Sequence, residues 1–132
     1  MHRIWNTLLI AGIIGIAASQ PTTGKAHSLT GEQIKNLISN RTVSLSTPFG
    51  LSLPLFYNSN GTVSGDISGF SLASAFAPKE QGRWWIDGNT MCQQWPTWYK
   101  GRRFCFRISK ISDNKIQWQR DDGATGTAVV QR

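Results

Sequence analysis

The pattern of apolar and polar residues predicts one short helix followed by a series of short strands. Ile34, Leu37 and Ile38 recur at the spacing of a helix face, so we expect a helix of about two to three turns there. Thr30 and Gln33 have the spacing of a capping box, in which each side chain binds the backbone N–H of the other. A helix this short is not stable by itself, and it must pack on the rest of the domain.

Alternating apolar and polar positions after the helix predict strands in the first half of the chain. We expect strands at residues 42–46, 51–57 and 62–65. Pro54 lacks a backbone N–H, which places its strand at a sheet edge or at a bulge. Residues 58–61, Asn-Ser-Asn-Gly, are typical of a hairpin turn. Residues 66–81 show no clear period, and we expect a weakly ordered connection there.

The second half carries clearer strand signals, separated by turn residues. We expect strands at residues 83–86, 90–95, 102–111, 115–120 and 127–130, with turns at residues 87–88, 96–101, 113–114 and 122–123. Turn signals about every 8–12 residues are typical of an antiparallel meander. The predicted fold class is therefore mainly β: a small antiparallel meander forming a half-barrel or barrel-like sheet, with one short N-terminal helix over an open end or face.

The start of the chain has the pattern of an export signal. Residues 8–18 form an uncharged apolar run behind a short, mildly basic start, as in a secretory signal peptide. The run has about half of the roughly 20 apolar residues that a spanning helix needs. Small residues at 17–19 or 24–26 would suit a signal peptidase. An uncleaved membrane anchor is the alternative, whereas a lipoprotein anchor is not expected because no cysteine ends the run.

We therefore expect residues 1–26 to be a signal peptide and processing region and residues 27–132 to be one domain. Such a protein is periplasmic or secreted, with no transmembrane span after cleavage. Loss of Arg3 and Lys25 from the 14 basic residues leaves 12 against seven acidic ones, a net charge of about +5. A positive domain favours anionic partners, although the charge also serves plain solubility. Export argues against a nucleic-acid partner.

Cys92 and Cys105 are the only two cysteines of the chain, and both lie in the exported part. In an oxidising compartment such a pair predicts a disulfide. The bond would close a loop of about 14 residues and stabilise the domain by roughly 3 kcal/mol. A metal site is the alternative, but the pair lacks companions, since His27 is the only histidine in residues 27–132. We expect no metal and no cofactor.

The cysteine pair also predicts a strand register. If Cys92 faces Cys105, side chains alternate between two faces on either side of the pair. A two-residue turn at residues 87–88 then pairs Trp85 with Thr90. The predicted core face holds Trp84, Ile86, Met91, Trp95, Phe104, Phe106 and Ile108.

The opposite face of this hairpin is a candidate ligand site. It collects Arg83, Trp85, Thr90, Cys92, Gln94, Arg103, Cys105 and Arg107. Guanidinium groups bind carboxylates and phosphates, and an indole stacks on rings, so this face suits an anionic or sugar-like ligand. The alternative is that Trp85 packs over the disulfide while the arginines are solvated.

Residues 98–103 at the hairpin tip add aromatic and basic side chains. Trp98 and Tyr99 complete the candidate ligand-binding set, and we expect them to be exposed on the turn. Large aromatic side chains are uncommon on a purely structural turn, which favours a binding role for the tip.

No catalytic residue is expected. The domain has no histidine within its β region, so a serine or cysteine nucleophile would lack a histidine base. Its carboxylates are Glu32, Asp66, Glu80, Asp87, Asp113, Asp121 and Asp122. Adjacent Asp121 and Asp122 could bind a cation, but two carboxylates before a glycine are typical of a turn.

Four segments together resemble a family of exported small β domains from alphaproteobacteria. They are Gly-Arg-Trp-Trp at residues 82–85, Met-Cys-Gln-Gln-Trp at 91–95, Phe-Cys-Phe at 104–106 and Trp-Gln-Arg-Asp-Asp-Gly at 118–123. The likeness covers about residues 82–130. It implies a periplasmic or secreted setting, a disulfide and a small barrel-like fold, and no site residues, because that family has no assigned function.

The leading functional hypothesis is a non-enzymatic periplasmic or secreted binding or envelope-associated protein. Its ligand would be an anionic glycan, a lipid headgroup or an envelope protein. A protein-directed inhibitor, or an accessory subunit of an envelope protein, is the alternative. A structural subunit without a ligand is the third possibility.

Overall fold

The computed structural model describes residues 12, 15, 27–47, 52–69 and 77–132. Apart from residues 12 and 15, the predicted signal peptide lies outside these residues, as does part of the connection expected at residues 66–81. The elements are β1 (His27–Ser28), α1 (Gly31–Ile38), β2 (Arg41–Ser46), β3 (Ser52–Tyr57), β4 (Thr62–Asp66), β5 (Lys79–Asp87), β6 (Thr90–Gln94), the 3-10 helix η2 (Trp98–Gly101), β7 (Phe104–Lys110), β8 (Lys115–Arg120) and β9 (Thr125–Val130).

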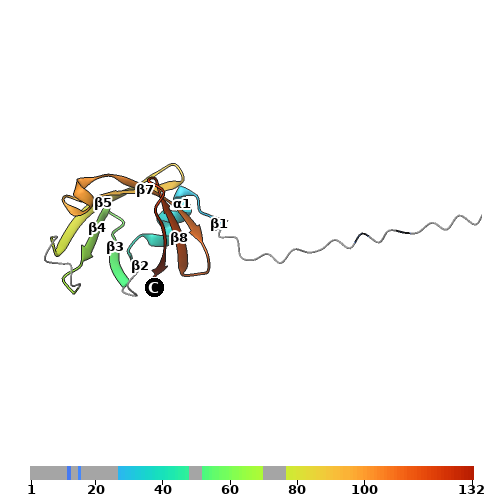
Figure 1. The fold of residues 1–132 in the computed structure, drawn as a ribbon, viewed down its shortest axis with the longest axis horizontal. Helices are drawn as coiled ribbons and strands as arrows, with labels where there is room; N and C mark the ends of the chain where they lie inside the picture. Colours follow the sequence, from blue (N-terminus) through green and yellow to red (C-terminus); the bar gives the residue numbers. More distant parts are fainter. Residues whose placement is uncertain (1–11, 13–14, 16–26, 48–51, 70–76) are drawn as a thin grey trace, which may run out of the picture.

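The strands from β2 to β9 form one closed antiparallel barrel (Figure 1). Each strand pairs with the next along the chain, and β9 returns to pair with β2, with Val43 opposite Val130 and Leu45 opposite Ala128. The mainly β, barrel-like prediction is confirmed. In the closed barrel Pro54 is not at a sheet edge: it faces Ser44 of β2, and the β4 ladder begins one residue later, at Leu55.

The antiparallel order gives the barrel two different ends. The turns after β3, β5 and β7 lie at one end, where α1 also lies, and we call it the helix end. The connection that contains η2 and the turn after β8 lie at the opposite end, the loop end. β1 was not predicted: it pairs with Lys110 and Ser109 of β7, beyond the part of β7 that pairs with β6.

Helix α1 closes the helix end. Its predicted capping box is present: the Gln33 backbone N donates to Thr30 Oγ1 at 3.2 Å, and the Thr30 N donates to Gln33 Oε1 at 2.9 Å. Ile34 and Ile38 are fully buried in the barrel core, which supplies the packing that so short a helix requires.

Gly31 fixes how closely the helix approaches the β5–β6 hairpin. A Cβ at Gly31 would collide with the carbonyl oxygen of Gly88 and lie 2.5 Å from Ile86 Cγ2. The Gly31 backbone N also donates to Asn89 Oδ1 at 3.1 Å. Only glycine permits this contact between the start of the helix and the hairpin turn.

The barrel interior holds the predicted core. Trp84, Met91, Trp95, Phe104 and Ile108 are buried, as expected from the alternation of faces. Ile86 and Phe106 are partly buried against the same core.

Three strand glycines make room for the largest core side chains. A Cβ at Gly65 would lie 2.6 Å from the Trp98 ring, and one at Gly82 would lie 3.1 Å from the Trp95 ring. Gly126 faces Trp118 across the β8–β9 ladder, and a Cβ there would collide with that indole. Glycine weakens a strand by itself, and at these three positions the packing of an aromatic ring against the glycine compensates for that loss.

Several boundaries differ from the sequence prediction. β5 begins at Lys79 and not at residue 83, and β7 begins at Phe104 and not at residue 102. The β5–β6 loop consists of Gly88 and Asn89, not residues 87–88. Gly88 has a φ of +58°, which suits the first central position of a type II′ turn, and this explains the shift by one residue.

We predict that Gly31→Ala destabilises the domain by about 1–3 kcal/mol, the usual cost of overpacking, because the helix must move away from Gly88. Urea unfolding followed by tryptophan fluorescence measures this. Gly69→Ala is the matched control, since a Cβ at Gly69 meets nothing within 4 Å. Equal stability of the two variants would contradict the proposed helix contact.

Candidate functional site

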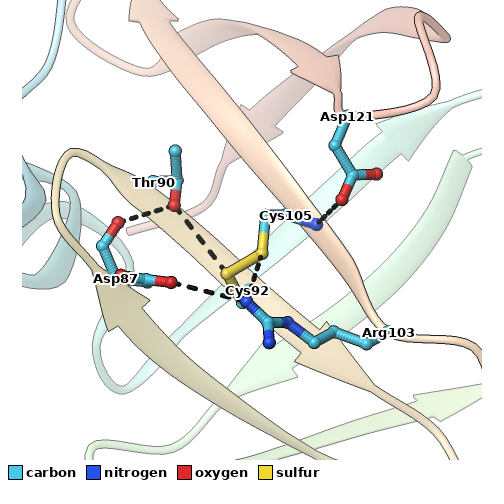
Figure 2. A network of polar contacts seen from close by, with 6 residues as sticks. All are labelled: Asp87, Thr90, Cys92, Arg103, Cys105 and Asp121. Carbon is cyan, nitrogen blue, oxygen red and sulfur yellow. Dashed lines mark hydrogen bonds and ion pairs between the residues drawn. A yellow bond between two sulfur atoms is a disulfide. The ribbon is translucent and has the colours of Figure 1, made fainter.

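The disulfide predicted between Cys92 and Cys105 is present and joins two neighbouring strands on the outer surface of the barrel (Figure 2). Cys92 faces Cys105 directly, Met91 faces Phe106, and the predicted β6–β7 register is confirmed. The Cys92 sulfur is shielded, since Cys92 is fully buried and Thr90 Oγ1 lies 3.8 Å from it, whereas Cys105 is half-buried.

The β5–β6 register differs from the prediction by two residues. Trp85 faces Cys92 and not Thr90, because the turn lies one residue later than expected. A slip of two residues preserves the side-chain faces, whereas a slip of one would reverse them. Arg83, Trp85, Arg103 and Arg107 therefore still share one outer face.

These four side chains do not converge on one point. Arg103 lies over the Trp85 ring, 5.7 Å from its centroid, and its Nη2 is 3.4 Å from Asp87 Oδ2. Arg83 pairs with Gln94, two residues from Cys92 toward the loop end, whereas Arg107 lies two residues from Cys105 toward the helix end. Arg83 and Arg107 are four positions apart along the strands, about 13 Å, and about 10 Å apart across them.

Two carboxylates on this outer face were not included in the predicted site. Asp87 pairs with Arg103, and Asp121 Oδ2 accepts from the Cys105 backbone N at 3.2 Å (Figure 2). The alternation along β5 already placed Asp87 beside Trp85, so this partner could have been found from the sequence. The pairing leaves Trp85 half-buried beneath Arg103, and the face is less basic than its arginines alone suggest.

The hairpin tip contains one buried and one exposed aromatic side chain. The expectation that Trp98 is exposed is wrong: it is 7% exposed, stacks on Trp95 at 4.6 Å, and its Nε1 donates to the Ala77 carbonyl at 2.7 Å. Tyr99 is 42% exposed, with its ring edge-on to Phe104. Trp98 therefore anchors the tip, and Tyr99 is displayed by it.

The backbone after Trp98 is left-handed at three consecutive residues. The φ angles are 55° at Tyr99, 57° at Lys100 and 70° at Gly101. This conformation costs roughly 1–2 kcal/mol for each residue with a side chain. Gln94 holds it in place, because its Nε2 donates to the Gly101 carbonyl at 3.0 Å.

Glu80 fixes the start of the same segment. Its carboxylate accepts from the backbone N–H groups of Thr97 and Trp98, each at 3.0 Å, and from the Thr97 hydroxyl. Burial acts to raise the pKa of Glu80, but the hydrogen bonds from Thr97 and Trp98 outweigh it and lower the pKa. The loop is thus tied to β5 by an ionised side chain.

Arg120 lies inside the loop end, between aromatic rings. Its guanidinium is 4.3 Å from the Phe104 centroid and 5.7 Å from that of Tyr99. Asp122 binds it through Nε and Nη2 at 2.8 and 2.7 Å, and this bond lowers the pKa of Asp122 to about 2. Desolvation raises the pKa of Tyr99, so its hydroxyl is neutral at pH 7.

Two hollows lie near Tyr99. An internal cavity of about 50 Å³ runs through the barrel from Ile38 to Arg120, and Gln93 accepts from the Tyr57 hydroxyl in its wall at 2.8 Å. A groove of about 380 Å³ lies outside, between Leu53 and the η2 segment. The inner cavity holds a few water molecules at most, whereas the groove accommodates a large side chain.

Metal binding and membrane-spanning helices are the two remaining questions for the part of the chain that the structure describes. No three His, Cys, Asp or Glu side chains there could hold a metal ion together. Among the same residues, none of the helices is long and apolar enough to cross a membrane. Comparison with known protein families, curated proteins and solved structures finds no match to this chain. The resemblance noted from the sequence therefore stays a prediction.

We predict that Glu80→Gln lowers stability at pH 7 by on the order of 1 kcal/mol, because an amide cannot accept so many hydrogen bonds. The folded pKa of Glu80 lies below its ordinary value of 4.5, so its contribution is full above that pH. It is lost as the pH falls through the folded pKa. Urea unfolding of both proteins from pH 7 to pH 3 should show the gap shrinking, and a constant gap would contradict this assignment.

We predict that Lys100→Gly stabilises the domain by about 0.5–1 kcal/mol, because glycine adopts a positive φ without the steric cost. The control is Lys115→Gly in β8, where glycine should destabilise by a similar amount. Thermal unfolding of the two variants tests the assignment, which fails if both lose stability.

Proposed function

We propose that this protein is an exported, non-enzymatic binding domain that contacts an acidic partner protein through the loop end of its barrel. The observation that carries the proposal is the segment of three consecutive left-handed residues at Tyr99, Lys100 and Gly101. Non-glycine residues keep such a conformation only where the surrounding structure enforces it, and such strain clusters at ligand contacts.

The loop is preorganised by four independent contacts. The disulfide joins the strands at its base, Glu80 binds its first turn, Trp98 is buried beneath it, and Gln94 holds the Gly101 carbonyl. A segment that is already ordered loses little conformational entropy on binding, so more of its contact energy appears as affinity.

The displayed side chains suit a protein surface that carries negative charge. Tyr99 supplies a half-exposed aromatic ring, and aromatic and arginine side chains commonly dominate protein contacts. Lys100 and Arg102 are exposed, and they form no ion pair with any residue that the structure describes. The adjoining groove between Leu53 and Tyr99 would receive an apolar side chain of the partner.

The exposed Tyr99, Lys100 and Arg102 side chains beside this mainly apolar groove favour a protein partner at this end, because aromatic and arginine side chains commonly dominate protein contacts. Inhibition of an envelope enzyme is one form that such binding would take. The disulfide is consistent with an oxidising compartment outside the cytoplasm. The periplasm or the extracellular space is the setting we propose.

The test places a photo-crosslinking amino acid at Tyr99 in the full chain expressed in its native host. We expect one discrete protein adduct, because the loop end is the contact surface. The matched control is the same substitution at Ile111, which is 45% exposed at the helix end.

Competition decides whether the adduct is specific. Excess unlabelled protein should abolish it, whereas Lys100→Glu combined with Arg102→Glu should compete at least about tenfold less well, as expected for the loss of two charged contacts. Equal adducts at positions 99 and 111, or equal competition by the charge-reversed protein, would refute the proposal.

A further inference from the structure

A second, polar groove lies at the opposite end of the barrel. Its volume is about 400 Å³, and it lies on the outer surface where β1 and the start of α1 meet β6 and β7. Its polar lining comes from Ser28, Thr30, Asn89, Thr90 and Arg107. Side-chain alternation in the sequence already predicts Thr90 and Arg107 on this outer face, whereas Ser28, Thr30 and Asn89 reach it only through the fold.

The lining has an excess of hydrogen-bond donors. The exposed guanidinium of Arg107 forms no ion pair or hydrogen bond with the described residues. Within the described residues, Asn89 bonds through its Oδ1 alone, which accepts from the Gly31 backbone N at 3.1 Å, so both Nδ2 hydrogens remain to donate there. The Thr30 hydroxyl accepts from Gln33 and keeps its own proton to donate.

Among the described residues, no carboxylate lines this groove. The nearest acidic residue along the hairpin is Asp87, whose carboxylate is bound to Arg103. Thr90 donates to the Asp87 backbone carbonyl at 2.7 Å, so its hydroxyl oxygen is held in place at the groove wall. The described surroundings therefore offer a fixed positive charge and several neutral donors without an internal anion to satisfy them.

We propose that this groove binds a phosphate or sulfate ester carried on a hydroxyl-rich, sugar-like body. The Arg107 fork matches an oxyanion, and the Asn89 amide and the threonine hydroxyls match sugar hydroxyls. A volume of about 400 Å³ exceeds the size of a free oxyanion and lies in the range of ordinary ligand sites. The ester could be a soluble sugar phosphate or the headgroup of a membrane lipid, and both present the same group to Arg107.

The site is separate from the proposed protein contact. The groove lies at the helix end, and Tyr99 and Lys100 lie at the loop end. A ligand here would act independently of the partner bound by the loop, so failure of one proposal leaves the other intact.

Titration of the ¹⁵N-labelled protein with glucose 6-phosphate tests the proposal. We expect saturable shifts of the Asn89 side-chain amide, absent with glucose and weaker with inorganic phosphate. Arg107→Gln should weaken binding about tenfold or more, since it removes the charged half of the contact. Arg83→Gln is the matched control: Arg83 is also exposed on the outer face but lies outside the groove, and its loss should change nothing.

Asn89→Asp sharpens the test. The aspartate keeps an acceptor for the Gly31 N–H, so α1 stays anchored, but it replaces the free donors with a negative charge. We expect loss of glucose 6-phosphate binding with unchanged circular dichroism. High salt should not restore glucose 6-phosphate binding to this variant, because the substitution removes the two Nδ2 donors of Asn89.

Vesicles distinguish the two sources of the ester. Binding to phosphatidylglycerol vesicles but not phosphatidylcholine vesicles, abolished by Arg107→Gln and retained by Arg83→Gln, would assign the site to lipid headgroups. Binding of glucose 6-phosphate alone would assign it to soluble esters. Absence of saturable binding to either probe, or equal weakening by Arg83→Gln and Arg107→Gln, would overturn the proposal.

Discussion

The ladder between β2 and β9 joins two segments that are far apart in the sequence, and the rest of the structure depends on it. Once Val43 pairs with Val130, the sheet has a closed interior of fixed width. Every inward side chain must then fit that interior. The indoles of Trp95, Trp98 and Trp118 fit because each covers a glycine on a strand, where a Cβ would collide or lie very close.

Closure also explains why the two ends of the barrel differ. The helix end is filled by α1, whose Ile34 and Ile38 complete the core, and by the close contact of Gly31 with the hairpin turn. The loop end has no comparable helix in the described chain. Arg120 lies there between Phe104 and Tyr99, and its charge is balanced by Asp122. A charged residue in this position keeps the mouth of the barrel polar while aromatic rings cover its sides.

The parts of the fold that depend on local pattern could be predicted from the sequence, and those that depend on long-range contact could not. The capping box at Thr30, the β8 boundaries and the Cys92–Cys105 register follow from spacing. Full closure, the pairing of β1 with Ser109 and Lys110, and the burial of Trp98 depend on contacts between distant segments, which periodicity does not encode. The candidate site likewise has a part that the sequence predicts and a part that only the structure shows. Alternation placed the arginines on one face, but only the structure shows that Arg103 is paired with Asp87 while Arg107 borders a groove.

The position of β1 has a consequence for how the domain is oriented. His27 pairs with Lys110, the last residue of β7, so the chain enters the barrel at the helix end. The segment before His27 is therefore attached at the helix end, opposite the loop end that carries Tyr99. If that segment were held at a membrane surface, the axis of the barrel would act as a spacer, with the polar groove near the bilayer and the rigid loop directed away from it. In a freely diffusing domain neither end would have a fixed direction relative to a membrane, so what happens to the segment before His27 decides whether the two proposed surfaces face the membrane and away from it.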